Sequence, residues 1–250
     1  MKAVVEVMGT VVSIDVRTPD VDAAAIETAF ETLREADRRF SLYREDSEVS
    51  RVVRGEVHAD GFSPDLREVL DIGARFERAS GGVFSLHPKG PLDTNGVVKG
   101  WAVDRAGRVL QASGAADFCI NAGGDVLARG SADEGSSEPS GWNVGVRSPW
   151  HPERMLAVLG VRDAAVATSG GYERGDHIVN GVSGLAASAL ASATVVADDL
   201  TTADVLATAV FAWGPEGVDW AASAYRCSVL AVLPDGELLT AGRLPLATGS

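Results

Sequence analysis

The spacing of apolar residues predicts strands and helices along the chain, and the stretch 192–213 shows this most clearly. Its apolar period changes midway from two residues to about 3.6, which indicates a strand, a turn and then a helix. Thr201 is a suitable N-cap and Gly214-Pro215 a suitable stop, so we expect the helix to run roughly from Thr202 to Trp213.

The same reasoning predicts further elements. An apolar stripe indicates a helix over 22–40, and residues 4–16 indicate one long strand with a bulge or bend at Met8-Gly9-Thr10. The remaining predicted elements are a helix from Ser63-Pro64 to Gly81, a helix from about Ala102 to Gly114, strands at 118–126 (with a tight turn at Gly123-Gly124), 142–147, 155–161, 165–168 and 176–181, a helix at 218–225 and a hairpin over 228–240. This mixed order allows an α+β fold.

One lysine has an unusual predicted position. The first half of the segment 92–104 indicates a loop and its second half a helix, so we expect Lys99 near a helix N-terminus. A positive charge there opposes the helix dipole, at a cost of a few tenths to about 1 kcal/mol at an exposed site. An anionic partner would relieve this cost, and the structural alternative is a surface lysine whose stem packs along the helix.

The helix after Thr201 carries a candidate cation site. Asp204 and Thr208 are four residues apart, so a carboxylate and a hydroxyl share one helix face and are close enough to serve one hard cation. The structural alternative is a capping box between Thr201 and Asp204, with the Thr208 hydroxyl bonded back to the carbonyl of Asp204. The stretch by itself favours the structural alternative.

Composition narrows the class of protein. The chain has 250 residues of which 46% are hydrophobic, enough for a substantial core. Its net charge of −13, from 22 basic and 35 acidic residues, argues against a general attraction to nucleic acid or anionic lipid. No apolar run reaches the roughly 18 residues of a transmembrane helix, so we expect no membrane span.

The cysteines and the first residues indicate the compartment. Cys119 and Cys227 each lie in an apolar, strand-like run, which suits buried free thiols better than a disulfide framework or a zinc site. Met1-Lys2 leads directly into a strand pattern without the apolar core of a signal peptide. We therefore expect a cytoplasmic protein.

Common catalytic signatures are weak in this chain. Ser169, in the sequence Thr168-Ser-Gly-Gly171, lacks the Gly-x-Ser-x-Gly pattern of a hydrolase nucleophile elbow, and we find no phosphate-loop or dinucleotide fingerprint. Of the four histidines, His177 is the one in a strand-like context. Taken singly, these features favour structural roles.

The residues of the short motifs and their order along the chain carry more information together than any single motif does. Together they resemble the ApbE family of FAD:protein FMN transferases, most specifically around Lys99 and over 204–208, with the likeness covering roughly residues 4–214. The motifs are Met8-Gly9-Thr10, Phe40-Ser41-x-Tyr43, Gly82-Val83-Phe84, Asp93-x-x-Gly96-x-x-Lys99-Gly100-x-Ala102-x-Asp104, Asn121-Ala-Gly-Gly-Asp125, Thr168-Ser-Gly, His177-Ile178 and Asp204-x-Leu206-Ala-Thr208.

The resemblance implies an α+β fold of mainly antiparallel sheets packed with helices, formed by residues 1–250 as one transferase domain. It implies Mg2+-dependent transfer of FMN from FAD to a threonine of an acceptor protein, with AMP released. It further implies that His177 is the catalytic base and that Gly96, by its carbonyl, binds Mg2+ with Asp204 and Thr208. The residues expected at the FAD site are Met8, Tyr43, Val83, Phe84, Ser85, Asp93, Lys99, His177 and Ile178.

Two departures from the family pattern bear on activity. Ser85 stands where the family usually has Asp, and Val179-Asn180 follows His177-Ile178 where the family usually has Asp-Pro. Two other functions therefore stay open: an FAD pyrophosphatase giving FMN and AMP, and a non-catalytic FAD-binding protein. For the transferase, the resemblance implies an acceptor carrying a short Ser/Thr-Gly-Ala-Ser/Thr-like motif.

Overall fold

The structure, a computed structural model, describes residues 1–133, 141–151, 153–171 and 178–247. Its centre is an eight-stranded sheet in the order β1-β2-β3-β4-β7-β8-β9-β10, in which every neighbouring pair is antiparallel. These strands are β1 (Lys2–Val7), β2 (Thr10–Val16), β3 (Phe118–Ala122), β4 (Asp125–Arg129), β7 (Ala164–Gly170), β8 (Ser192–Ala197), β9 (Ser228–Val232) and β10 (Leu238–Ala241). A second, two-stranded sheet joins β5 (Trp142–Arg147) to β6 (Met155–Val161).

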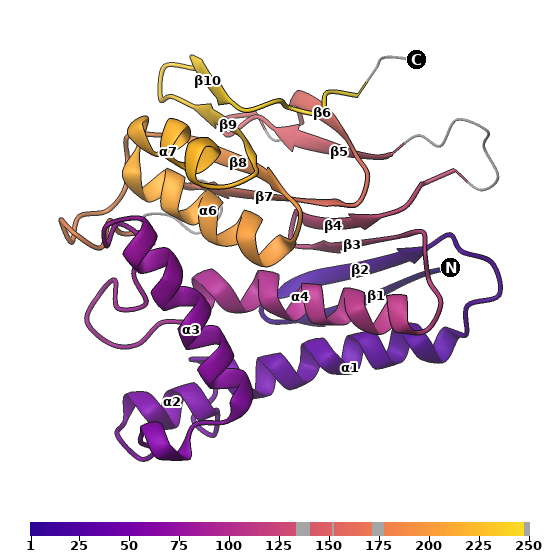
Figure 1. Cartoon of the computed structure of the whole chain (residues 1–250), viewed down its shortest axis with the longest axis horizontal. Coiled ribbons are helices and arrows are strands. Elements are labelled where there is room, and N and C mark those ends of the chain that lie inside the picture. Colours follow the sequence, from indigo (N-terminus) through magenta and orange to yellow (C-terminus); the bar gives the residue numbers. More distant parts are fainter. Residues whose placement is uncertain (134–140, 152, 172–177, 248–250) are drawn as a thin grey trace.

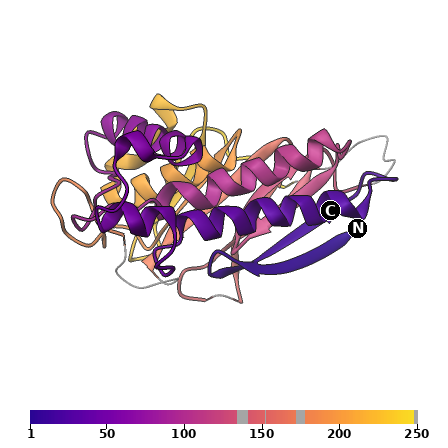
Figure 2. The same cartoon turned by 90° about the horizontal axis from the view of Figure 1, so that it is seen from below.

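Helices cover one face of the large sheet (Figure 1). The described helices are α1 (Ala23–Phe40), α2 (Glu48–Val53), α3 (Pro64–Ala79), α4 (Asn95–Ala112), α6 (Leu200–Trp213) and α7 (Glu216–Ala224), with a short 3-10 turn at Ala59–Gly61. Helices α1, α4, α6 and α7 contact the sheet, while α2 packs against α1 and α3 against α4. Helices α1 and α4 lie side by side, as both views show (Figures 1 and 2). No described helix is both long and apolar enough to cross a lipid bilayer.

Two hydrophobic cores lie on opposite faces of the large sheet. The larger core joins that sheet to α1, α4 and α6, and the smaller joins its other face to β5 and β6. Trp142 and Leu159 of the small sheet face Val126, Val166 and other residues of the large sheet in the smaller core. The chain is therefore layered as helices, large sheet and small sheet.

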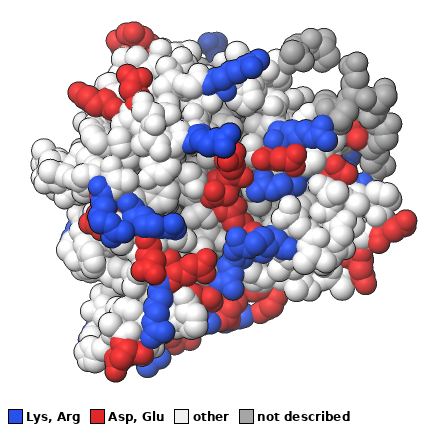
Figure 3. Space-filling view, in the orientation of Figure 1, with Lys and Arg blue, Asp and Glu red and all other residues white. Residues whose placement is uncertain are grey.

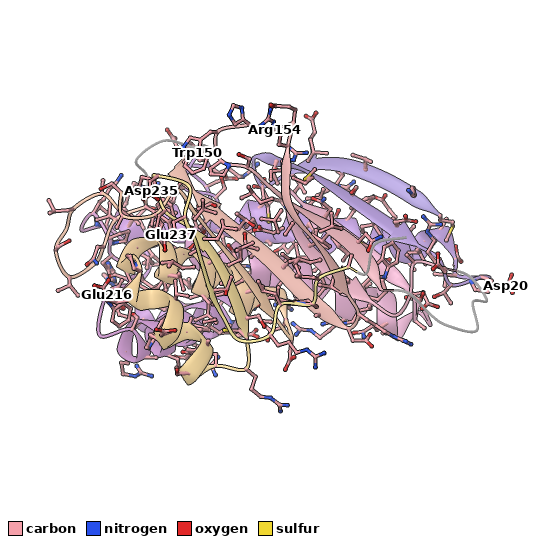
Figure 4. All side chains as sticks on the ribbon, turned by 90° about the horizontal axis from the view of Figure 1, so that it is seen from above. Asp20, Trp150, Arg154, Glu216, Asp235 and Glu237 are labelled. Atoms are coloured by element: carbon pink, nitrogen blue, oxygen red, sulfur yellow. The ribbon has the colours of Figure 1, made fainter. Side chains whose placement is uncertain are left out.

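The loop between β5 and β6 lies at one end of the molecule. Trp150, in the β5–β6 loop, lies beside the β9–β10 turn, since a Cβ on Gly236 would be 4.0 Å from the Trp150 ring. Figure 4 shows Trp150 and Asp235 at this end and Asp20 at the other. The C-terminal segment then pairs with β6 through a bridge between Leu246 and Leu159.

Local sequence signals explain the helix starts. Asp22 caps α1 by accepting from the Ala24 N–H at 2.9 Å, and Ser63 caps α3 by accepting from the Leu66 N–H at 3.1 Å.

On the exposed face of α1, Arg34 pairs with Glu27 at 2.6 Å. Figure 3 shows such basic and acidic side chains intermixed over the helical face. Exposed pairs of this kind add little stability, so the buried stripe holds the helix in place.

The predicted elements over the described residues are confirmed, with a few corrections. The bulge expected at Met8-Gly9 is wrong: these two residues are the turn of a hairpin between β1 and β2, with φ values of 54° and 69°. Helix α4 begins at Asn95, well before the expected start near Ala102, and α2 was not expected. Of the expected strand at 176–181, Asp176 and His177 lie outside the described residues, and Val179 forms an isolated bridge with Ala186.

Candidate active site

The strand register brings several polar residues to one end of the large sheet. Ala122 pairs with Asp125 across the β3–β4 turn, and Gly170 at the end of β7 pairs with Ser192 at the start of β8. The Thr168 N–H donates to Asp125 Oδ1 at 2.9 Å, which fixes that carboxylate at the edge. Side chains from distant parts of the sequence therefore meet where α4 and α6 cover this end.

Helices α4 and α6 approach each other very closely at Gly100. A Cβ at this position would lie 2.5 Å from the Leu200 carbonyl oxygen and 2.8 Å from Thr201 Cα, both of them backbone atoms. Because glycine has no Cβ, the two backbones can pack in direct contact. This contact brings the Gly100 N–H within 3.2 Å of Asp204 Oδ2, to which it donates.

Lys99 joins two buried carboxylates. Its ammonium forms ion pairs with Asp125 Oδ2 and, at 3.3 Å, with Asp204 Oδ1. The side chains of Asp125 and Asp204 are 4% and 6% exposed, whereas that of Lys99 is 32% exposed. The expectation that Lys99 has an anionic partner is confirmed, and the alternative of a plain surface lysine is wrong.

Burial dominates the electrostatics of Asp204. Removal from water raises the pKa of its carboxyl to about 7; the nearby Asp125 charge adds to this, and Lys99 opposes it. A cation placed at Asp204 would favour the charged form for the same reason that Lys99 does.

Oxygen atoms of other residues surround the same region. Thr208 Oγ1 lies 3.3 Å from Ser169 Oγ, and a Cβ on Gly96 would be 4.0 Å from Thr208 Cγ2. Thr94, two residues before Gly96, is fully buried, and its hydroxyl has no hydrogen-bond partner in the described part of the chain. One carboxylate with hydroxyl and carbonyl oxygens is a donor set that suits a hard cation such as Mg2+.

The donor set does not suit a softer metal. Among the described residues, no three His, Cys, Asp or Glu side chains gather closely enough to form a metal site. Both described cysteines are free, and burial raises the pKa of Cys119 to about 12. The described cysteines therefore do not form a thiolate site.

The alternative of a capping box at Asp204 is wrong. The N-cap of α6 is Asp199, whose side chain accepts from the Thr202 N–H at 2.7 Å, so the helix starts at Leu200. Thr201, the expected cap, instead donates its hydroxyl to Asp104 on α4. This leaves Asp204 facing Lys99 and Gly100.

Asp104 holds the first turn of α6 to α4. It accepts from the Leu200 N–H at 2.9 Å and the Thr201 N–H at 2.8 Å, besides the Thr201 hydroxyl. Burial raises its pKa, and these hydrogen bonds partly offset the effect. Sequence analysis assigned no role to Asp104, yet it fixes the helix that carries Asp204.

The residues expected to bind FAD lie in several segments. Phe84 is buried and its ring packs against Gly96, where a Cβ would be only 3.0 Å away. Asp93 accepts from the Asn95 N–H at 2.9 Å at the start of α4. Met8 lies in the β1–β2 turn, while Tyr43 lies in the loop between α1 and α2 and is 95% exposed.

The two segments that depart from the family pattern contact each other. The Gly181 N–H donates to the Val83 carbonyl at 2.9 Å, and a Cβ on Gly181 would lie 2.7 Å from Ser85 Cβ. Ser85 donates to Glu77 at 3.0 Å, and Asn180 donates to the carbonyl of Ala212, at the end of α6, at 3.1 Å. Ile178 begins this segment and packs against the larger core. His177 lies outside the described residues.

Besides Asp104, the sequence reasoning missed two residues of the site. Asp125 was recognised as part of a motif but given no role, although it is a buried carboxylate in ion-pair contact with Lys99. Ser169 was considered as a nucleophile alone, and it contacts Thr208. A charged residue at the start of an otherwise apolar strand was the available signal for Asp125.

Comparisons with known proteins agree with this fold. A model of the ApbE family matches residues 8–87 and 85–231. The chain therefore belongs to the ApbE family. A solved flavin transferase ApbE from Vibrio cholerae superposes with a TM-score of 0.82 at 22% identity, covering 97% of each chain. The ApbE protein from Thermotoga maritima superposes with the same score, covering 96% of each chain. The α+β fold expected from the sequence is confirmed.

Two curated relatives carry the same name, FAD:protein FMN transferase. The protein from Treponema pallidum (strain Nichols) is 32% identical over 139 residues, which cover 50% of this chain and 38% of that protein. The protein from Vibrio cholerae (strain O395) is 25% identical over 290 aligned positions, covering 90% of this chain and 85% of that protein. The first alignment thus spans well under half of its relative, and the second most of it.

Proposed function

We propose that this chain transfers FMN from FAD to a threonine side chain of an acceptor protein and releases AMP. The observation that carries the proposal is the juxtaposition of Asp204, Thr208 and Gly96 with the Lys99 ammonium at one end of the sheet. Membership of the ApbE family and the names of its relatives support the same reaction. We also propose that residues 1–250 form one domain, because both cores share the large sheet, and that it acts in the cytoplasm.

Asp204, Thr208 and the Gly96 carbonyl would hold Mg2+ in this proposal. In a regular α-helix the Gly100 N–H serves the carbonyl of Gly96, and here it also donates to Asp204. A carbonyl oxygen has two lone pairs, so the Gly96 carbonyl can bind a cation while it accepts the helix hydrogen bond. Bound there, the cation would neutralise charge that develops on the pyrophosphate.

The residues of the chain would position the two reactants. Lys99 offers an ammonium to the FAD phosphates, while Met8, Val83, Phe84, Ser85, Asp93 and Ile178 would surround the rest of the substrate. The threonine oxygen forms a bond to the FMN phosphorus as the bond from that phosphorus to the AMP oxygen breaks. His177 accepts the threonine proton, a role suited to an imidazole with a near-neutral pKa.

The test uses the purified full chain with FAD, Mg2+ and a domain that carries a Ser/Thr-Gly-Ala-Ser/Thr-like motif. AMP, free FMN and protein-bound flavin are quantified with and without acceptor, and again with EDTA. We expect AMP in equal amount to covalent flavin, and no product with EDTA. AMP with free FMN alone would assign an FAD pyrophosphatase, and intact bound FAD would assign an FAD-binding protein.

Tyr43→Ala is expected to raise the KM for FAD roughly tenfold, because stacking of an aromatic base on a side chain contributes about 1–3 kcal/mol. The nearly complete exposure of Tyr43 leaves its ring available for such a contact. Steady-state kinetics at varied FAD would show it. Tyr43→Phe keeps the ring and should retain the wild-type KM. Trp150→Ala, which removes a half-exposed aromatic side chain from another loop, is a control that should also retain it. An unchanged KM in Tyr43→Ala would remove Tyr43 from the FAD site.

A further inference from the structure

The ammonium of Lys99 is shared between carboxylates that belong to different elements. Asp125 begins β4 and Asp204 lies in α6, and both are almost fully buried. Asp125 is fixed by the Thr168 N–H and Asp204 by the Gly100 N–H. Among the described residues, two carboxylates face one ammonium here, so these three groups carry a net negative charge when both carboxylates are ionised.

A divalent cation on Asp204 would change this balance. Asp204 would gain a stronger counter-ion, and the ammonium of Lys99, 3.3 Å from the same carboxylate, would be repelled by it. Asp125 is the second partner that Lys99 already has, and it is not among the proposed ligands. Lys99 can therefore leave Asp204 while its charge stays compensated at the edge of the site.

We propose that Lys99 is the internal counter-ion of Asp204 in the metal-free site, and that Asp125 is a positioning residue that retains the ammonium when a divalent cation replaces it on Asp204. This inference rests on the proposed function for the identity of the cation site. It extends that function by giving Lys99 two states, one paired with Asp204 and one directed to the phosphate-bearing substrate. Asp125 acts through Lys99 in both.

Metal binding without FAD or acceptor tests the inference. Full-length protein stripped with EDTA is titrated with Mn2+, and free Mn2+ is followed by electron paramagnetic resonance. Lys99→Met removes the competing cation and should bind Mn2+ about tenfold more tightly, whereas Asp125→Asn lets Lys99 pair fully with Asp204 and should bind it about tenfold more weakly. Because Asp125 acts through Lys99, the double variant should bind Mn2+ about as tightly as Lys99→Met.

A thermal-unfolding series separates exchange of counter-ions from a general effect of charge. Metal-free Lys99→Met should melt lower than the wild type, because two buried carboxylates lose their partner, and saturating Mn2+ should restore most of the loss. Lys2 and Asp15 form a matched surface pair at 3.2 Å, so Lys2→Met and Asp15→Asn serve as controls that should change neither Mn2+ affinity nor its effect on melting.

Several outcomes would overturn the inference. These are equal weakening of Mn2+ binding in Lys99→Met and Asp125→Asn, no change in either, failure of Mn2+ to restore the Lys99→Met protein, or no Mn2+ binding by the wild type. FMN transfer is measured separately. Opposite shifts in Mn2+ affinity without any FMN transfer would overturn the proposed function and leave the counter-ion exchange standing.

Discussion

Asp204→Asn is expected to lower the rate of FMN transfer by roughly a thousandfold, the equivalent of about 4 kcal/mol of transition-state stabilisation. The substitution removes the one carboxylate in the proposed cation site and leaves a carbonyl oxygen that can still accept from the Gly100 N–H. Initial rates of AMP release and of acceptor labelling at saturating FAD measure the effect. Raising Mg2+ should recover little of the rate.

Stability measurements distinguish this loss from misfolding. Burial raises the pKa of Asp204 to about 7, so above that pH the ionised side chain costs free energy in the folded chain relative to an unfolded chain with an ordinary aspartate. That cost is present at pH 8 and decreases as the pH falls through 7. Asp204→Asn removes it and should melt no lower than the wild type at pH 8. Asp198→Asn, at an exposed aspartate nearby, should change neither rate nor melting. Full activity in Asp204→Asn would rule out Asp204 as the cation ligand.

Local patterns predicted those elements whose signals lie within a few residues. The apolar stripe and caps of α1 and α3 are local, as is the change of period between β8 and α6. The sequence predicts a bulge or bend at Met8-Gly9, where the structure has a hairpin turn, because methionine seldom adopts the positive φ that this turn requires.

The contacts that define the site are long-range, and local reasoning could not supply them. The Thr201 hydroxyl donates to Asp104, 97 positions earlier in the chain. Thr201 therefore does not cap α6, although it is a good N-cap residue by local criteria. Asp199 is the N-cap of α6 instead, and Asp204 forms an ion pair with Lys99. Asp125 entered the site through the strand register alone. The family resemblance connected Lys99 and Asp204 to one reaction, but their direct ion pair came from the structure.

The predicted start of α4 was wrong for a related reason, which involves two glycines. Gly96 and Gly100 weaken the local helix signal, which placed the predicted start near Ala102, although the helix begins at Asn95. Tertiary packing overrides this preference at Gly100, where the backbone of α6 occupies the space that a side chain would need. The residue that obscured the helix is therefore the one that permits its contact with α6.

Gly100→Ala is accordingly expected to lower Tm by roughly 10 °C, because overpacking of this kind costs about 3 kcal/mol and each kcal/mol shifts a chain of this size by about 3 °C. In an exposed helix the same change would stabilise by about 1 kcal/mol. The new Cβ would meet the Leu200 carbonyl at 2.5 Å and Thr201 Cα at 2.8 Å, and backbone atoms cannot rotate away. The steric clash therefore outweighs the gain in helix propensity, so we expect Gly100→Ala to destabilise the protein.

Separation of the helices should also impair the site. Lys99 moves with α4 and Asp204 with α6, so a shift of a few tenths of an ångström lengthens their 3.3 Å contact and disturbs the Gly100 N–H bond to Asp204. Calorimetric melting and Mn2+ titration of the same samples measure both effects. Gly61→Ala is the matched control, because its Cβ would find an ordinary contact at 3.4 Å from Val57. A Gly100→Ala protein that melts at or above the wild-type temperature would contradict the close helix contact on which this site depends.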